Sequence, residues 1–97
     1  MIVVDDGALE EFSKKHNQAR APIREWLKTT SNANWRHLMD VRRTHPSADG
    51  KVKSFGYTVF NIKGNSYRLI TLIDYKKQIV DVVNVFTHAE YDRWNKS

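Results

Sequence analysis

The sequence predicts an α+β fold, with N-terminal helices packed on a mainly antiparallel sheet of three or four strands and a short C-terminal helix. Apolar residues recur at helical spacing through the first half of the chain. From Phe55 onward, β-branched and aromatic residues dominate, as they do in strands. A helix-capping pattern follows the last apolar run. With 97 residues, 40% of them hydrophobic, we expect one domain over residues 1–97.

Two short helices joined by a tight turn are expected at the N-terminal end. Residues 2–4 form a short apolar run that fits either an edge strand or the approach to the first helix. Asp5 or Asp6 can cap a helix over about residues 6–16. A second helix begins near Ala21-Pro22, because proline is well tolerated in a first turn. The faces expected to be buried consist of Leu9, Phe12 and His16, then Ile23, Trp26, Leu27 and Thr30.

The middle of the chain predicts a third short helix and then an irregular connection. Residues 31–34 form a cluster typical of turns. The helix is indicated by the spacing of Trp35, Leu38, Met39 and Arg42. Residues 45–51 are rich in turn-forming types, and we expect them to be the least regular stretch.

Three strands are predicted in the second half, over residues 57–62, 67–73 and 79–86. Turn residues at 63–65 and 74–77 connect them, and such short connections predict an antiparallel meander. Because the strands are apolar on both faces, the helices must cover one face and another element must partly shield the other.

The sharpest local signal is the capping box formed by Thr87 and Glu90. It predicts that a terminal helix begins directly after the last strand. His88 then lies in the first turn of that helix, and Tyr91 lies three residues later on the same side.

The charge of the chain favours a polyanionic partner. Sixteen Lys and Arg residues against eleven Asp and Glu give a net charge of +5. Residues 51–97 supply most of it, with eight basic and four acidic residues. A basic face attracts nucleic acid, the commonest intracellular polyanion, although the same excess also serves simply to keep a small protein soluble.

Several other kinds of site are disfavoured. The chain has no cysteine, which excludes disulfides and thiolate nucleophiles and is compatible with a cytoplasmic location. The four histidines have no close ligand spacing and the glycines match no phosphate-binding loop, so we expect no metal site and no nucleotide loop. The apolar runs fall far short of the roughly 18 residues that span a bilayer, so no membrane association is expected.

The remaining Arg, His, Tyr, Lys and Asn side chains suit metal-free cleavage of RNA. RNA carries its own nucleophile, the 2′-hydroxyl, so a protein need only remove that proton, stabilise the phosphorane and protonate the leaving oxygen. Each candidate also has an ordinary structural interpretation. Arg68 can pair with a carboxylate, His88 can be an exposed residue at a helix start, and Tyr91 can belong to the core.

Three segments together resemble one protein family. Residues 59–70, Val-Phe-Asn-Ile-Lys-Gly-Asn-Ser-Tyr-Arg-Leu-Ile, resemble the central motif of HigB-family toxins of bacterial toxin–antitoxin systems. Residues 87–94, Thr-His-Ala-Glu-Tyr-Asp-Arg-Trp, are similar to their C-terminal motif. Residues 45–49, His-Pro-Ser-Ala-Asp, are similar to the turn before their sheet. The order and spacing of the three segments agree over essentially the whole chain.

The resemblance implies a small RelE-like ribonuclease that cleaves mRNA at the ribosome without a cofactor and so inhibits translation. It implies that Arg68 stabilises charge on the phosphate, and that His88 and Tyr91 are acid–base and positioning residues. The side chains implied to bind mRNA or ribosomal RNA are Asn61, Lys63, Asn65, Lys51 and Lys53. The implied protein partner is a helix-turn-helix antitoxin similar to HigA, and operator DNA is reached only through the antitoxin complex.

The chain departs from the family in its last predicted strand, which has Asp81 and Val83 where many members have Tyr or Arg. Two other functions stay open. One is a non-catalytic RNA- or ribosome-binding module with the same basic face, and the other is an interaction domain whose apolar sheet face binds a partner chain. The cleavage hypothesis predicts that Arg68, His88 and Tyr91 converge on one open face of the sheet.

Overall fold

The computed structural model describes residues 1–53 and 55–96 of the chain. The elements in this part are β1 (Ile2–Val4), α1 (Gly7–Lys15), the 3₁₀ turn η1 (Asn17–Ala19), α2 (Arg20–Ser31), α3 (Leu38–Thr44), β2 (Asp49–Val52), β3 (Tyr57–Ile62), β4 (Tyr67–Asp74), β5 (Ile79–Thr87) and α4 (His88–Lys96). Most of the helices precede the strands, and a short helix ends the described chain. The predicted α+β class is therefore confirmed.

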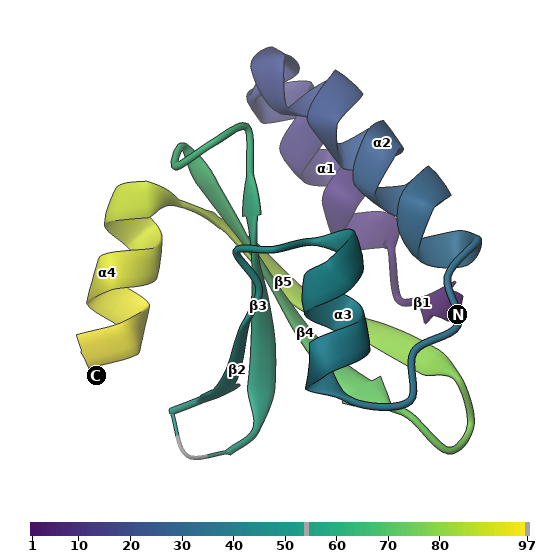
Figure 1. The fold of residues 1–97 in the computed structure, drawn as a ribbon. Helices are drawn as coiled ribbons and strands as arrows, with labels where there is room; N and C mark the ends of the chain where they lie inside the picture. Colours follow the sequence, from purple (N-terminus) through teal and green to yellow (C-terminus); the bar gives the residue numbers. More distant parts are fainter. Residues whose placement is uncertain (54, 97) are drawn as a thin grey trace.

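The strands of the described chain form one sheet of five, in the order β1-β5-β4-β3-β2 (Figure 1). β2 to β5 pair antiparallel with their neighbours in sequence, so the predicted meander is confirmed. β1 lies at one edge and pairs parallel with β5. The sheet thus has more strands than the three or four predicted, because β1 and β2 are short edge strands that form by pairing with β5 and β3.

Long-range pairing creates both edge strands. The apolar run at residues 2–4 is an edge strand, and the backbone N–H of Ile2 donates to the carbonyl of Gln78 at 2.7 Å. The expectation of an irregular connection through residues 45–51 is wrong from Asp49 onward, since β2 pairs with β3 across a register shift. The sequence Asp-Gly-Lys-Val carries little strand preference, and Lys51 has a φ of 60° within the shift. The neighbouring strand therefore determines this element.

The predicted helices are present, with corrected starts. Asp6 occupies the cap position of α1 but makes no side-chain capping hydrogen bond. α3 begins at Leu38 instead of near Trp35. The backbone N–H of Arg36 donates to the Asp40 carboxylate at 2.9 Å, and His37 has an extended backbone, so the helix cannot begin earlier. Met39 does not join a buried face, since 64% of it is exposed.

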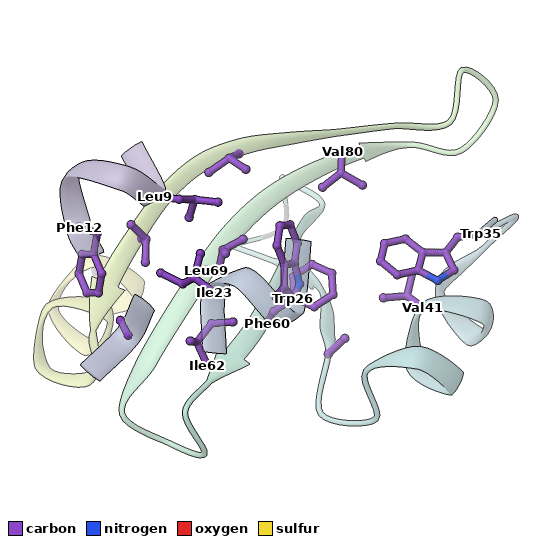
Figure 2. Close-up of a cluster of buried hydrophobic side chains, with 14 residues drawn as sticks. Leu9, Phe12, Ile23, Trp26, Trp35, Val41, Phe60, Ile62, Leu69 and Val80 are labelled. Carbon is purple, nitrogen blue, oxygen red and sulfur yellow. The ribbon is translucent and has the colours of Figure 1, made fainter. Parts of the chain in front are cut away.

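The helices cover the two faces of the sheet unequally. α1, α2 and α3 lie on one face, where their apolar side chains and those of the strands form the main core (Figure 1). Figure 2 shows Trp26 of α2 beside Phe60 of β3, and their ring centroids lie 5.2 Å apart in an edge-to-face contact. The largest side chains that are almost fully buried in this core include Trp35, Phe60, Leu9 and Leu69.

α4 lies against the opposite face of the sheet. A second, smaller apolar cluster consists of Val52, Val59 and Ile70, with Tyr91 and Trp94 of α4 packed against it. This confirms that a further element shields the second face of the apolar strands. Because side chains alternate along a strand, Arg68 shares this face with Ile70, two residues away. No helix in the described ranges is long and apolar enough to cross a membrane.

Candidate active site

Strand register places Arg68 in the middle of a cross-strand row. Arg68 of β4 is paired with Asn61 of β3 on one side and with Phe86 of β5 on the other. Directly paired residues project to the same face, so all three lie on the face that carries α4. The Arg68 residue is only 8% exposed.

Neutral acceptors hold the Arg68 guanidinium. Its Nη1 donates to the carbonyls of Asn65 and Tyr67 at 3.1 and 3.2 Å, and its Nη2 donates to the side-chain oxygen of Asn65. Within the described residues, none of the ion pairs includes Arg68. The interpretation of Arg68 as half of a carboxylate bridge therefore finds no support among the described residues. There, dipoles orient the positive charge and no carboxylate pairs with it.

The predicted capping box places His88 beside Arg68. The N–H of Thr87 donates to Glu90 Oε1 at 2.8 Å, and the N–H of Glu90 donates to Thr87 Oγ1 at 3.2 Å. These bonds start α4 at His88, whose own N–H donates to the carbonyl of Ser66 in the β3–β4 turn at 3.0 Å. The backbone hydrogen bond from Thr87 also lowers the pKa of the Glu90 carboxyl below its ordinary value.

Both ring nitrogens of His88 have polar neighbours. Nδ1 lies 3.2 Å from Arg68 Nη2, and Nε2 lies 3.3 Å from Asp92 Oδ2, one turn further along α4. A guanidinium nitrogen can only donate, so Nδ1 is the acceptor in this arrangement. This arrangement fits the imidazole tautomer that carries its proton on Nε2, facing Asp92.

Tyr91 completes the group. The Arg68 guanidinium carbon lies 5.5 Å from the centroid of the Tyr91 ring, within the range of a cation–π contact. Partial burial raises the pKa of the Tyr91 phenol above its ordinary value of 10, nearby Asp49 and Asp92 raise it further, and Arg68 opposes them. The phenol consequently keeps its proton at neutral pH. Arg68, His88 and Tyr91 thus lie together on one face of the sheet.

The other residues singled out in the sequence are divided between this group and more distant positions. Asn61 shares the cross-strand row of Arg68, and Asn65 contacts the guanidinium directly. Lys63 points toward the helical layer, where its Nζ donates to Gln18 at 2.7 Å. Lys51 lines a cavity of about 260 Å³ next to α3. Lys53 reaches the C-terminal end of α4, where its Nζ donates to the carbonyl of Trp94 at 2.8 Å.

Sequence reasoning did not include Asp92 or Asp49 in the site. The spacing of four residues between His88 and Asp92 within a predicted helix was a usable signal for the first. Asp49 was not predictable, because it reaches Tyr91 only through the unforeseen strand β2. In the described part of the chain no three His, Asp or Glu side chains are placed to hold a metal ion.

The two family departures lie elsewhere on β5. Asp81 is paired with Val4 of β1, and its side chain contacts Asp5. The hydrogen bond with Asp5, burial and the charge of Asp5 raise the pKa of the Asp81 carboxyl. Val83 is 41% exposed and contributes no charge. Neither residue is part of the contacts that surround Arg68.

Comparison with known proteins connects this arrangement to a family. Residues 19–94 match the HigB toxin family, described as the RelE-like toxic component of a toxin–antitoxin system. The mRNA interferase toxin HigB of Escherichia coli (strain K12) is 24% identical to the chain over 92 residues, which cover 95% of this chain and 88% of that protein. The mRNA interferase HigB of Shigella flexneri matches with the same identity and coverage.

Proposed function

Since the chain belongs to the HigB family of RelE-like toxins, we propose that it is an mRNA interferase: a metal-independent endoribonuclease that cleaves mRNA at the ribosome and so inhibits translation. The observation that carries the proposal is the contact of the Arg68 guanidinium, which lacks a carboxylate partner in the described chain, with the His88 imidazole. A cation, a base and a protonated phenol side by side are the groups that attack by a 2′-hydroxyl requires.

Arg68 supplies the electrostatic part of the proposed reaction. A phosphate that displaces Asn65 Oδ1 and His88 Nδ1 from Nη2 receives a charge-assisted hydrogen bond in their place. The carbonyls of Asn65 and Tyr67 continue to hold Nη1, so the guanidinium stays oriented as charge develops on the phosphorane.

His88 supplies the base. When the phosphate takes the place of His88 on Arg68 Nη2, Nδ1 becomes free to accept the proton of the 2′-hydroxyl, and Asp92 stabilises the imidazolium through Nε2. The 2′-oxygen then bonds to phosphorus and the bond from phosphorus to the 5′-oxygen breaks. This leaves a 2′,3′-cyclic phosphate on one fragment.

Tyr91 supplies the acid. Its raised pKa keeps the phenolic proton available for the departing 5′-oxygen, which ends as a hydroxyl. Asn61 and Asn65 position the RNA beside the trio, and the lysines at 51, 53 and 63 attract phosphates of mRNA or ribosomal RNA from the surrounding surface.

The proposed partners follow from the family. A toxin of a toxin–antitoxin system implies an antitoxin, for which we propose a helix-turn-helix protein similar to HigA. Binding to operator DNA occurs only through that complex, and the site of action is the cytoplasm, where mRNA and ribosomes are found.

Primer extension on a defined mRNA, with and without translating ribosomes, tests the proposal. We expect cuts only in the presence of ribosomes, and we expect Arg68→Ala to abolish them. Arg24→Ala is the matched control, because it removes one positive charge from an exposed position on α2. Cuts without ribosomes would keep the ribonuclease and remove the ribosome from the mechanism. Inhibited translation without any cut would instead favour the non-catalytic RNA- or ribosome-binding module.

A further inference from the structure

A continuous series of aromatic rings extends from the trio to the β2–β3 loop. The Tyr91 ring, next to Arg68, has its centroid 5.8 Å from that of Trp94. Trp94 lies 5.3 Å from Tyr57, and Tyr57 lies 5.0 Å from Phe55. α4 and the first strands of the meander lie alongside one another on this side of the molecule (Figure 1). We refer to Tyr91, Trp94, Tyr57 and Phe55 as the aromatic row.

The inner and outer members of the aromatic row differ in what they contribute to folding. Tyr91, Trp94 and Tyr57 are partly buried against the second apolar cluster on Val59 and Ile70, which accounts for their presence. Phe55 is 67% exposed. A single exposed aromatic side chain is common on protein surfaces, but Phe55 is in ring contact with Tyr57 and so extends the aromatic row into solvent, where its face is open to a ligand.

Positive charge accompanies the rings. Lys53 Nζ lies 4.8 Å from the Trp94 ring centroid and donates to the Trp94 carbonyl, which anchors an ammonium group on the row. Aromatic faces bordered by cations are the recurring means of binding single-stranded RNA, because every base offers a π face to a ring and every linkage offers a phosphate to a cation.

We propose that Phe55, supported by Tyr57, is a stacking subsite for an mRNA base beyond the nucleotides at the cut. The inference rests on the proposed function, since the aromatic row leads to Arg68 and both are proposed to contact the same mRNA strand. RNA is favoured over a protein ligand because the row is continuous with the proposed phosphate site and carries Lys53. Stacking on a ring is tolerant of sequence, so the subsite contributes affinity for any base.

The test combines a protein variant with a modified mRNA. Phe55→Ala removes the ring, Phe55→Trp keeps a stacking surface, and Met39→Ala is the matched control at another exposed apolar position, 64% exposed on α3. The mRNA carries a single abasic nucleotide, placed in turn at each position around the cut. Cleavage rates are measured at subsaturating mRNA with translating ribosomes.

Phe55→Ala is expected to slow cleavage of the intact mRNA by roughly 5- to 150-fold, the range for loss of one stacked base. Phe55→Trp and Met39→Ala are expected to cleave at about the wild-type rate. At one abasic position the wild type should slow to the level of Phe55→Ala, and the variant should lose nothing more, because the same contact is already absent.

Two failures are distinguishable. If the wild type cleaves and Phe55→Ala cleaves equally fast, the subsite is wrong while the proposed function stands. The same holds if every abasic position slows the wild type and Phe55→Ala by the same factor. If the wild type does not cleave with ribosomes, the proposed function fails and the subsite fails with it.

Discussion

Nη2 of Arg68, on strand β4, lies 3.2 Å from Nδ1 of His88, the first residue of α4. The contact joins the sheet to the terminal helix at the point where both reach the β3–β4 turn. It also fits the imidazole tautomer with its proton on Nε2, since the guanidinium can only donate and Nδ1 is then the acceptor.

Asp92→Asn should reduce cleavage without unfolding the protein. The Asp92 carboxylate faces the Nε2–H of His88 at 3.3 Å, and the carboxamide cannot stabilise an imidazolium in the same way. We expect kcat to fall by about 10- to 100-fold, no more than the lower end of the about 10²- to 10⁴-fold range for a general acid or base, because Asp92 acts through His88. Single-turnover rates from pH 5 to 9 measure the loss and the altered pH profile. Asp74→Asn, at the exposed last residue of β4, should cleave normally, and an unchanged Asp92→Asn enzyme would contradict the role of Asp92.

Tyr91→Phe should remove the proposed acid while the packing of the ring is kept. The ring still packs on Trp94 and Arg68, but no phenolic proton reaches the leaving oxygen. We expect cleavage to slow by about 10²- to 10⁴-fold, while the unfolding midpoint changes little. Tyr75→Phe, on the opposite side of the sheet near α3, is the control. Full activity of Tyr91→Phe would assign the proton to another donor.

Thr87→Ala should destabilise the helix that carries His88. The substitution removes the hydroxyl that accepts the N–H of Glu90, and loss of such a cap costs about 0.5–2 kcal/mol. Urea unfolding followed by circular dichroism gives the free-energy change. Thr29→Ala is the matched control, since that hydroxyl bonds the carbonyl of Glu25 within α2 and caps nothing. Equal stabilities for the two variants would show that the box contributes nothing to α4.

The free energy of unfolding should decrease as the pH falls below about 6.5 because of His45. Its ring packs against Trp26 and Phe60 with Nε2 3.2 Å from the Thr30 hydroxyl, and burial lowers its pKa from the ordinary value of 6.5. Below pH 6.5 the His45 side chain is protonated in the unfolded chain but not yet in the folded chain. The free energy of unfolding therefore decreases with falling pH until the lower pKa of the folded state is reached.

Urea unfolding at pH 7.5 and 5.5 measures this decrease. His45→Gln should flatten it, whereas exposed His37→Gln should not. Asp40 does not contribute in that window, since hydrogen bonds from Arg36 hold its pKa at about 2 and its effect is lost only below the ordinary value of 3.8. A decrease that persists in His45→Gln would assign it to other groups.

Local chemistry accounts for the parts of the fold that the sequence predicted. The capping box consists of hydrogen bonds between Thr87 and Glu90, three residues apart, so the local sequence predicted it and with it the start of α4. The three central strands were readable from their β-branched and aromatic runs. β2 was missed because its residues have no such preference and are ordered by pairing with Val59 and Tyr57.

The sequence by itself determined the α+β class, the meander, the terminal helix and the identity of the candidate residues, because each depends on neighbours within a few positions. Only the tertiary structure decided how those residues meet. Strand register and the packing of α4 bring Arg68 to His88 across 20 positions of sequence and place Asp49 near Tyr91. They also direct Lys63 and Lys51 away from the trio. Such contacts depend on pairing and packing over the whole sheet, which no local pattern of residues encodes.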